Sequence, residues 1–230
     1  MTRGKLIVIE GIDGAGKGTQ AGLLAHALQE RGIAFVTFSF PRYESSFGRL
    51  IAQFLNGDFG PLAAVDPHFS ALLYAGDRLE AKPDLEGALN SGRAVVLDRY
   101  VASNLAHQAA RMPAERRGEF VGWLRQLEYG IYGLPAEDLV IYLRVPAAQG
   151  HRLVGLKSAR NYTAKTRDLQ ESDVPHLKEA ALVYDELALA PNWVTVNCFE
   201  AESGKHRRPE EIHRDVLEAI ESRAFARAVR

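Results

Sequence analysis

A glycine-rich segment near the N-terminus constrains the fold more than any other part of the sequence. Residues 9–20 read IEGIDGAGKGTQ and follow a short apolar run over residues 6–9. A short apolar run that ends at glycine is typical of a buried strand. Residues 17–32 then place apolar side chains on one helical face and end at a glycine, which is a common helix stop. The sequence therefore predicts a strand, a loop and a helix in succession.

The loop carries the chemical signal of a phosphate-binding site. It fits the template G-x-x-x-x-G-K-[ST], except that a glycine fills the last position and a threonine follows one residue later. Glycine lets the backbone approach a ligand closely and turn its N–H groups around an anion. The helix N-terminus adds a partial positive charge, and the lysine adds a full one. We therefore expect a nucleotide's phosphates to be bound by Gly11, Ile12, Asp13, Gly14, Ala15, Gly16, Lys17, Gly18 and Thr19.

Length and composition fit one α/β domain over residues 1–230. The chain is 47% apolar, which suffices for a sizeable core, and its formal net charge is -1. That charge provides no basic field to recruit nucleic acid or an anionic membrane, so we expect neither partner. Cys198 is the only cysteine, which excludes an internal disulfide framework. No signal peptide precedes the first predicted strand and no apolar run is long enough to span a bilayer, so we expect a cytoplasmic protein.

Five short segments are predicted to be strands. They are mostly apolar without alternation, as in strands buried on both faces, and helix-patterned stretches separate them. This pattern predicts a doubly wound α/β fold in which a parallel sheet has helices on both faces. Residues 43–90 are predicted to form two or three helices beside the sheet. The five predicted strands are residues 5–10, 34–40, 94–98, 139–145 and 193–197.

Polar residues follow three of these strands. The first strand ends at Glu10, the second runs into Phe40-Pro41-Arg42, and the third ends in Asp98-Arg99-Tyr100. In an open parallel sheet, ligands bind beyond the carboxyl ends of the strands. Two arginines and several carboxylates on one rim are costly unless anions or metal ions balance them.

Phosphoryl transfer between nucleotides would use such a rim. It requires neutralised charge on the migrating group, two oxygens held in line and little covalent catalysis. Lys17 and the loop N–H groups would hold the donor phosphates, with Thr19, or a water network at Gly18, on the magnesium side. Asp98 is the residue expected to orient the magnesium waters. Two arginines, Arg42 and Arg99, suit phosphate, although each has a salt bridge as its alternative role.

The chain resembles the nucleoside monophosphate kinases, and closely the thymidylate kinases. The resemblance extends from the loop at Gly11 to the helix through Tyr184 and depends on five motifs in this order. It implies a P-loop NTPase three-layer fold with a mobile lid, transfer of the ATP γ-phosphate to dTMP with Mg²⁺ for dTTP synthesis, and a homodimer. The motifs are EGIDGAGKGTQ, FPRY at 40–43, YAGDR at 74–78, DRYVASN at 98–104 and GLPAEDLVIYL at 133–143.

The same resemblance implies roles for individual residues. Asp13 would face the acceptor's ribose 3′-hydroxyl and the metal, and Arg42 and Arg99 would hold its phosphate. Tyr74 would stack on the base and Arg78 would reach the O4 edge of thymine, although a purely core role is the alternative for Tyr74. His107 stands where a bulky aromatic often lies against the sugar's 2′ carbon, and it could instead be a core or surface group. The remaining predicted substrate residues are Phe40, Pro41, Tyr43, Ser103, Asn104 and Gln108.

Residues 156–168 form a basic segment with weak apolar periodicity. A mobile segment or a merely solvated loop would both account for its four basic side chains. The resemblance implies a lid, because Gly14 occupies the loop position where one class of the family carries its catalytic arginine. In the other class the lid supplies it. Arg160 or Arg167 would then close over the donor and act in catalysis.

Other functions remain open from the sequence. A kinase for dUMP or another monophosphate shares the phosphate loop, and so does a deoxynucleoside kinase. A non-catalytic P-loop nucleotide switch would bind ATP only to change shape. The two rim arginines, Arg42 and Arg99, argue against the switch.

Overall fold

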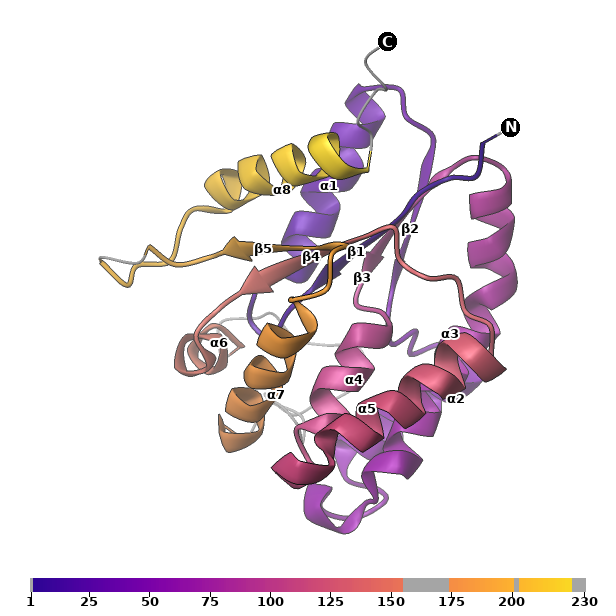
Figure 1. The fold of residues 1–230 in the computed structure, drawn as a ribbon, viewed down its shortest axis with the longest axis vertical. Helices are drawn as coiled ribbons and strands as arrows, with labels where there is room; N and C mark the ends of the chain where they lie inside the picture. The colour runs from indigo at the N-terminus through magenta and orange to yellow at the C-terminus, as the bar shows by residue number, and fades with distance from the viewer. Residues whose placement is uncertain (1, 155–173, 201–202, 225–230) are drawn as a thin grey trace.

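The computed structural model describes residues 2–154, 174–200 and 203–224. Its centre is one sheet of five parallel strands in the order β2-β3-β1-β4-β5 (Figure 1). The predicted parallel sheet is confirmed, and each predicted strand agrees with the structure to within one residue at either end. The strands are β1 (Leu6–Glu10), β2 (Phe35–Ser39), β3 (Ala94–Asp98), β4 (Leu139–Arg144) and β5 (Trp193–Asn197).

The three central strands are buried on both faces, as their unbroken apolar runs predict. For β2 and β5 that expectation is wrong. Thr37 and Ser39 of β2, and Thr195 and Asn197 of β5, are exposed. Both strands lie at an edge of the sheet with a neighbour on one side only, and the flanking helices cover them incompletely.

Helices cover both faces of the sheet, as the α/β pattern predicts (Figure 1). On one face α1 packs beside α8, and on the other α4 lies between α3 and α7. The helices are α1 (Lys17–Glu30), α2 (Ser46–Asn56), α3 (Pro67–Asn90), α4 (Val101–Ala109), α5 (Arg117–Arg125), α6 (Ala147–Val154), α7 (Val174–Leu187) and α8 (Pro209–Arg223). Short turns of helix are η1 (Leu62–Ala64), η2 (Ala114–Arg116) and the π-helix η3 (Gln126–Ile131).

The segment between β2 and β3 forms the helices that were predicted beside the sheet. The Ser45 hydroxyl caps α2 by accepting from the Gly48 N–H at 2.8 Å, and Gly57 ends that helix in a left-handed conformation. Asp66 caps α3 by accepting from the His68 N–H at 2.7 Å. α2 and α3 enclose a small apolar cluster of their own, separate from the main core around the sheet.

Within the described ranges, no helix combines the length and apolarity needed to cross a bilayer. The predicted lid at 156–168, with Arg160 and Arg167, lies outside the described residues.

Candidate active site

The carboxyl ends of β1, β2 and β3 meet at one rim. Asp98, the last residue of β3, is in register with Ser39 of β2 and Ile9 of β1. Beyond the strands the Phe40 N–H donates to the Asp98 carbonyl at 3.0 Å, and the Arg99 N–H donates to the Ile9 carbonyl at 3.1 Å. The predicted convergence of three strand ends is therefore confirmed.

The glycine-rich loop turns tightly over this rim. Gly11 has a φ of 145°, and a Cβ there would lie 2.6 Å from the Leu143 carbonyl oxygen. Gly14 has a φ of 85°, and its Cβ would lie 2.3 Å from the Gly150 carbonyl oxygen. Side chains are thus excluded by both conformation and space. α1 begins directly after the loop without a side-chain cap, which leaves its first N–H groups available to an anion.

Lys17, the first residue of α1, lies folded back over the loop. Its side chain is buried, and the ammonium donates to the Ile12 carbonyl oxygen at 2.9 Å. A full positive charge therefore lies within the turn, beside the N–H groups of the helix start. This is the arrangement expected for binding a nucleotide's phosphates.

One oxygen of the Asp98 carboxylate is buried and has no hydrogen-bond partner within the described chain. Its other oxygen would be 3.2 Å from a Cβ on Gly18, whereas Thr19 is exposed on α1. A carboxylate oxygen without a donor, next to a phosphate loop, fits a hydrated Mg²⁺. The part of the chain that is described contains no group of three or more histidine, cysteine, aspartate or glutamate side chains placed to hold a metal ion.

Arg99 links the loop to α4. It is a non-glycine residue with a left-handed φ of 69°. Its guanidinium donates to Asp13 Oδ1 at 2.5 Å and to Ser103 Oγ at 3.1 Å. Burial would lower the pKa of Arg99, but the Asp13 carboxylate, assisted by Asp98 and Glu10, raises the pKa above its ordinary value. The cation is therefore permanent and placed beside the loop.

Glu10 organises the start of α4 and was not among the predicted site residues. Its fully buried carboxylate accepts from the Tyr100 N–H at 2.7 Å and the Ser103 N–H at 3.1 Å. It also accepts from the hydroxyls of Ser103 at 2.6 Å and Tyr184 at 2.8 Å. Because α4 has no cap of its own, Glu10 takes that role from the end of β1. Its place at a strand end was the available signal.

Arg42 is held by Asp77, a residue of the YAGDR motif that sequence reasoning did not single out. Asp77 is buried and accepts from the Arg42 N–H at 2.8 Å and from its Nε at 3.0 Å, while the Asp77 carbonyl accepts from Nη2 at 2.8 Å. The guanidinium also lies 5.8 Å from the centre of the Phe40 ring. A cis peptide joins Phe40 to Pro41. Arg42 is thus oriented at the rim beside β2.

The predicted base-reading residues lie on α3 and α4. Tyr74 packs edge-on against Phe54, with ring centres 6.5 Å apart. Arg78 is buried and donates through Nε and Nη2 to Glu128 at 2.5 Å and 2.7 Å. Burial would lower the pKa of Arg78, but Glu128 raises it overall. Asn104 donates to the same carboxylate at 2.9 Å.

Two side-chain amides on α4 each keep one buried atom without a hydrogen-bond partner in the described residues: Asn104 Oδ1 and Gln108 Nε2. The oxygen of Gln108 accepts from Ser70 Oγ at 2.8 Å and from Arg111 Nη1 at 2.9 Å. Asn104 and Gln108 are one helical turn apart and share a face. Together they offer one acceptor and one donor that the described residues leave unused.

His107 is buried, so the surface alternative for it is excluded. Its Nε2 lies 3.5 Å from Arg99 Nη1, and its Nδ1 lies 3.3 Å from Nε2 of His176 at the start of α7. Burial, with the positive neighbours Arg99 and Lys17, lowers the pKa of His107 well below 6.5, although Asp13 acts in the opposite direction. The imidazole is therefore neutral at physiological pH.

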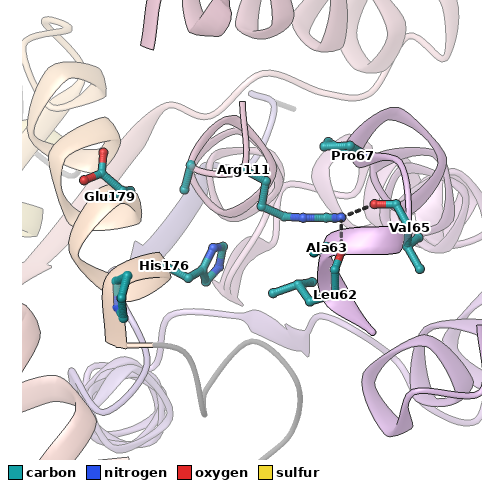
Figure 2. Close-up of a pocket in the computed structure, with 9 residues that line it drawn as sticks. Leu62, Ala63, Val65, Pro67, Arg111, His176 and Glu179 are labelled. Atoms are coloured by element: carbon teal, nitrogen blue, oxygen red, sulfur yellow. Dashed lines mark hydrogen bonds between the residues drawn. The ribbon is translucent and has the colours of Figure 1, made fainter. Parts of the chain in front are cut away.

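A cavity of about 410 Å³ lies between the C-terminal end of α4, the first turns of α7 and the segment before α3. Arg111 extends across it and donates to the carbonyls of Leu62 and Val65 (Figure 2). His176 and Glu179 line the opposite side. Because His176 also contacts His107, the cavity adjoins the predicted sugar side of the site.

Comparisons with known proteins agree with each other. A family model described as thymidylate kinase matches residues 9–206. Thymidylate kinase of Mycobacterium tuberculosis is 37% identical over 192 residues, which cover 82% of this chain and 87% of the relative. A probable thymidylate kinase of Pyrococcus abyssi is 30% identical over 220 residues, covering 95% and 96%. The solved thymidylate kinase from Candida albicans shares the fold, with a TM-score of 0.73 at 21% identity over 96% of this chain and 92% of that one.

Proposed function

Because this chain belongs to the thymidylate kinase family, we propose that it transfers the γ-phosphate of ATP to dTMP, giving ADP and dTDP for dTTP synthesis. The observation that carries the proposal is the junction of the phosphate loop with the end of β3. There Arg99 reaches Asp13, and Asp98 has one oxygen without a partner in the described residues while its other oxygen lies close to Gly18. Charges that a nucleotide and its metal would balance are thus collected where ligands of parallel sheets bind.

The donor ATP is held by residues 11–19. The N–H groups of the loop and of the α1 start surround its phosphates, and Lys17 exchanges its bond to Ile12 for a phosphate oxygen. Asp98 would hold Mg²⁺ through its waters, with Thr19 on the same side of the ion. When bound, Mg²⁺ neutralises charge on the donor phosphates and the migrating group.

The acceptor phosphate is held by Arg42 and Arg99. Asp77 and Asp13 orient these two guanidinium groups, which favours bidentate contacts with phosphate oxygens. An oxygen of the dTMP phosphate then bonds to the γ-phosphorus as the bond to the bridging β-phosphate oxygen breaks, and ADP leaves. Asp13 also faces the 3′-hydroxyl of the acceptor. Positioning and charge neutralisation account for the catalysis, and no covalent intermediate is needed.

The thymine base and the sugar are read by side chains of α3, α4 and the FPRY segment. Tyr74 stacks on the base, Arg78 donates to O4, and the unused acceptor of Asn104 and donor of Gln108 meet its other polar atoms. The neutral His107 lies against the sugar. Phe40, Pro41, Tyr43 and Ser103 complete this wall.

We also propose how the site closes, how the protein assembles and where it is located, on the resemblance to the family. Arg160 or Arg167 closes over the donor and excludes water, which protects ATP from hydrolysis. The protein is a cytoplasmic homodimer. α3 supports the dimer because it exposes Phe69, Leu72 and Leu79, with 47%, 38% and 38% of their surfaces accessible.

The test is an ADP-release assay with ATP, Mg²⁺ and, in parallel, dTMP, dUMP, thymidine, AMP and CMP. We expect turnover with dTMP and a loss of kcat/KM on the order of 10³-fold in Arg99→Ala. Arg93→Ala is the matched control, because Arg93 lies just before the same strand, is exposed, and its guanidinium donates to the nearby Ser91 hydroxyl at 3.0 Å. Turnover with AMP or thymidine instead would contradict the base assignment. Absence of turnover with every acceptor would favour a nucleotide switch.

A further inference from the structure

Glu128 is a fully buried carboxylate that contacts two of the side chains assigned to the base. It accepts from Arg78 Nε and Nη2 at 2.5 Å and 2.7 Å and from Asn104 Nδ2 at 2.9 Å. It lies on the π-helix η3, a wider turn of a kind that often occurs at functional sites. It shares its helical face with the buried Phe120, Leu124 and Leu127. Glutamate side chains are rarely buried completely unless they are paired, so the contacts of Glu128 need an explanation.

The Glu128 carboxylate and the Ala71 carbonyl together fix which way the Asn104 amide points. Asn104 Nδ2 lies 2.9 Å from Glu128 Oε1 and 3.0 Å from the Ala71 carbonyl oxygen. Both partners are acceptors only, so the –NH₂ group must face them. Oδ1 is then left on the opposite side of the amide, where it is buried without a partner in the described chain. Asn104 therefore offers the site a hydrogen-bond acceptor at Oδ1, and its donor group is not available there.

We propose that Glu128 is a positioning residue that sets the choice of pyrimidine, by fixing the Asn104 amide and the Arg78 guanidinium together. Thymine and uracil carry N3–H and O4, which match an acceptor beside a donor. Cytosine carries an unprotonated N3 and an amino group. Its N3 would set an acceptor against the Asn104 oxygen, and its amino group would set a donor against the Arg78 guanidinium. A mismatch of this kind in a buried site leaves polar groups unpaired, which gives strong discrimination. The proposal depends on the base assignment made under the proposed function.

Replacement of Glu128 by glutamine keeps its shape but removes this control. A glutamine has one acceptor oxygen. Because Oε1 accepts from both Arg78 and Asn104 and Oε2 accepts from Arg78, its –NH₂ group must face an Arg78 donor in either orientation, and in one of them it faces Asn104 as well. We expect Glu128→Gln to lower the ratio of kcat/KM for dTMP to that for dCMP at least tenfold, mainly through KM for dTMP. The KM for ATP should change less than twofold, because the donor is held at the strand ends.

The matched control is Glu137→Gln, a second glutamate near η3 whose carboxylate is bonded to Tyr129 and not to Arg78 or Asn104. It should leave the dTMP-to-dCMP ratio unchanged. If Glu128→Gln does not fold, Glu128→Asp retains the charge on a shorter stem. It should show an intermediate ratio. Asn104→Ala provides the separate test of base reading.

Each outcome distinguishes the inference from the proposed function. A fall in the ratio with both Glu128→Gln and Asn104→Ala supports the inference. A fall only with Asn104→Ala overturns it and leaves the base assignment intact. Equal losses with dTMP and dCMP in Glu128→Gln would show a merely structural role and also overturn it. An unchanged ratio in both variants, with dTMP still phosphorylated, would remove the base assignment itself.

Discussion

Replacing Glu10 by glutamine tests whether a carboxylate at the end of β1 holds the acceptor side of the site in place. Glutamine retains the volume and one acceptor oxygen, which can keep the N–H bonds of Tyr100 and Ser103. It loses the charge and presents –NH₂ to the hydroxyls of Ser103 and Tyr184, which now donate to Glu10. Because Ser103 also accepts from Arg99, the guanidinium should lose part of its support.

The magnitude follows from the four hydrogen bonds that Glu10 accepts. A bond to a charged group contributes about 1.5–3 kcal/mol and a neutral one about 0.5–1.5 kcal/mol, a difference of about 1 kcal/mol per bond. Four bonds give at most about 4 kcal/mol, and relief from burying a charge reduces the net effect. We expect Glu10→Gln to lower the free energy of unfolding by about 2–3 kcal/mol, a large share of a typical total.

The assay is urea unfolding at 25 °C, followed by circular dichroism, together with steady-state kinetics for dTMP. Glu186→Gln is the control, since that glutamate is exposed on α7. Glu10→Ala should lose more than Glu10→Gln, because it leaves two backbone N–H groups unpaired and a cavity behind. A loss below about 1 kcal/mol in Glu10→Gln, or equal stability of the two variants, would refute the argument that charge-assisted capping organises α4.

Two further predictions concern regions away from the phosphates. Burial raises the pKa of Glu137 from 4.5 to about 7. As pH rises, the unfolded chain therefore loses this proton at a lower pH than the folded protein does. Relative to Glu137→Gln, the wild type should lose up to about 3 kcal/mol of stability as pH rises from about 4.5 to about 7, measured by urea unfolding at several pH values. A difference in unfolding free energy between the wild type and Glu137→Gln that does not change with pH would contradict this. In the second prediction, Leu72→Glu with Leu79→Glu on the exposed face of α3 should convert a dimer to a monomer by light scattering. An unchanged mass would exclude α3 as the interface.

The sequence predicted those parts of the fold that depend on local pattern. Strand β1, the loop at Gly11 and helix α1 all have signals within about ten residues of each other. The rim was also predictable, because parallel strands must end on the same side. The edge strands were different: the apolar run of β2 resembles that of a central strand, and only the strand order shows that Thr37 and Ser39 are exposed.

The buried carboxylates of the site could not be predicted in the same way. Glu10 is 90 residues from Tyr100, and Glu128 is 50 residues from Arg78. Contacts at such separations depend on how helices pack across the sheet, which no local pattern encodes. A weak signal existed for Glu128, since it occupies an apolar helical face. The sequence offered Thr19 or a water network at Gly18 for the metal side; Gly18 lies next to the Asp98 carboxylate, and the choice between the two stays a prediction.

In this fold, strand ends and helices position the side chains assigned to two different properties of the enzyme, which are phosphate binding and nucleobase preference. Side chains assigned to the phosphates follow β1, β2 and β3, whose hydrogen-bonded register leaves little freedom. Those assigned to the base lie on α3, α4 and η3, which touch one another through side chains. The two sets meet at Asp77 of α3 and Ser103 of α4, which contact Arg42 and Arg99, so a change of nucleobase preference by repacking helices has to leave these two side chains in place.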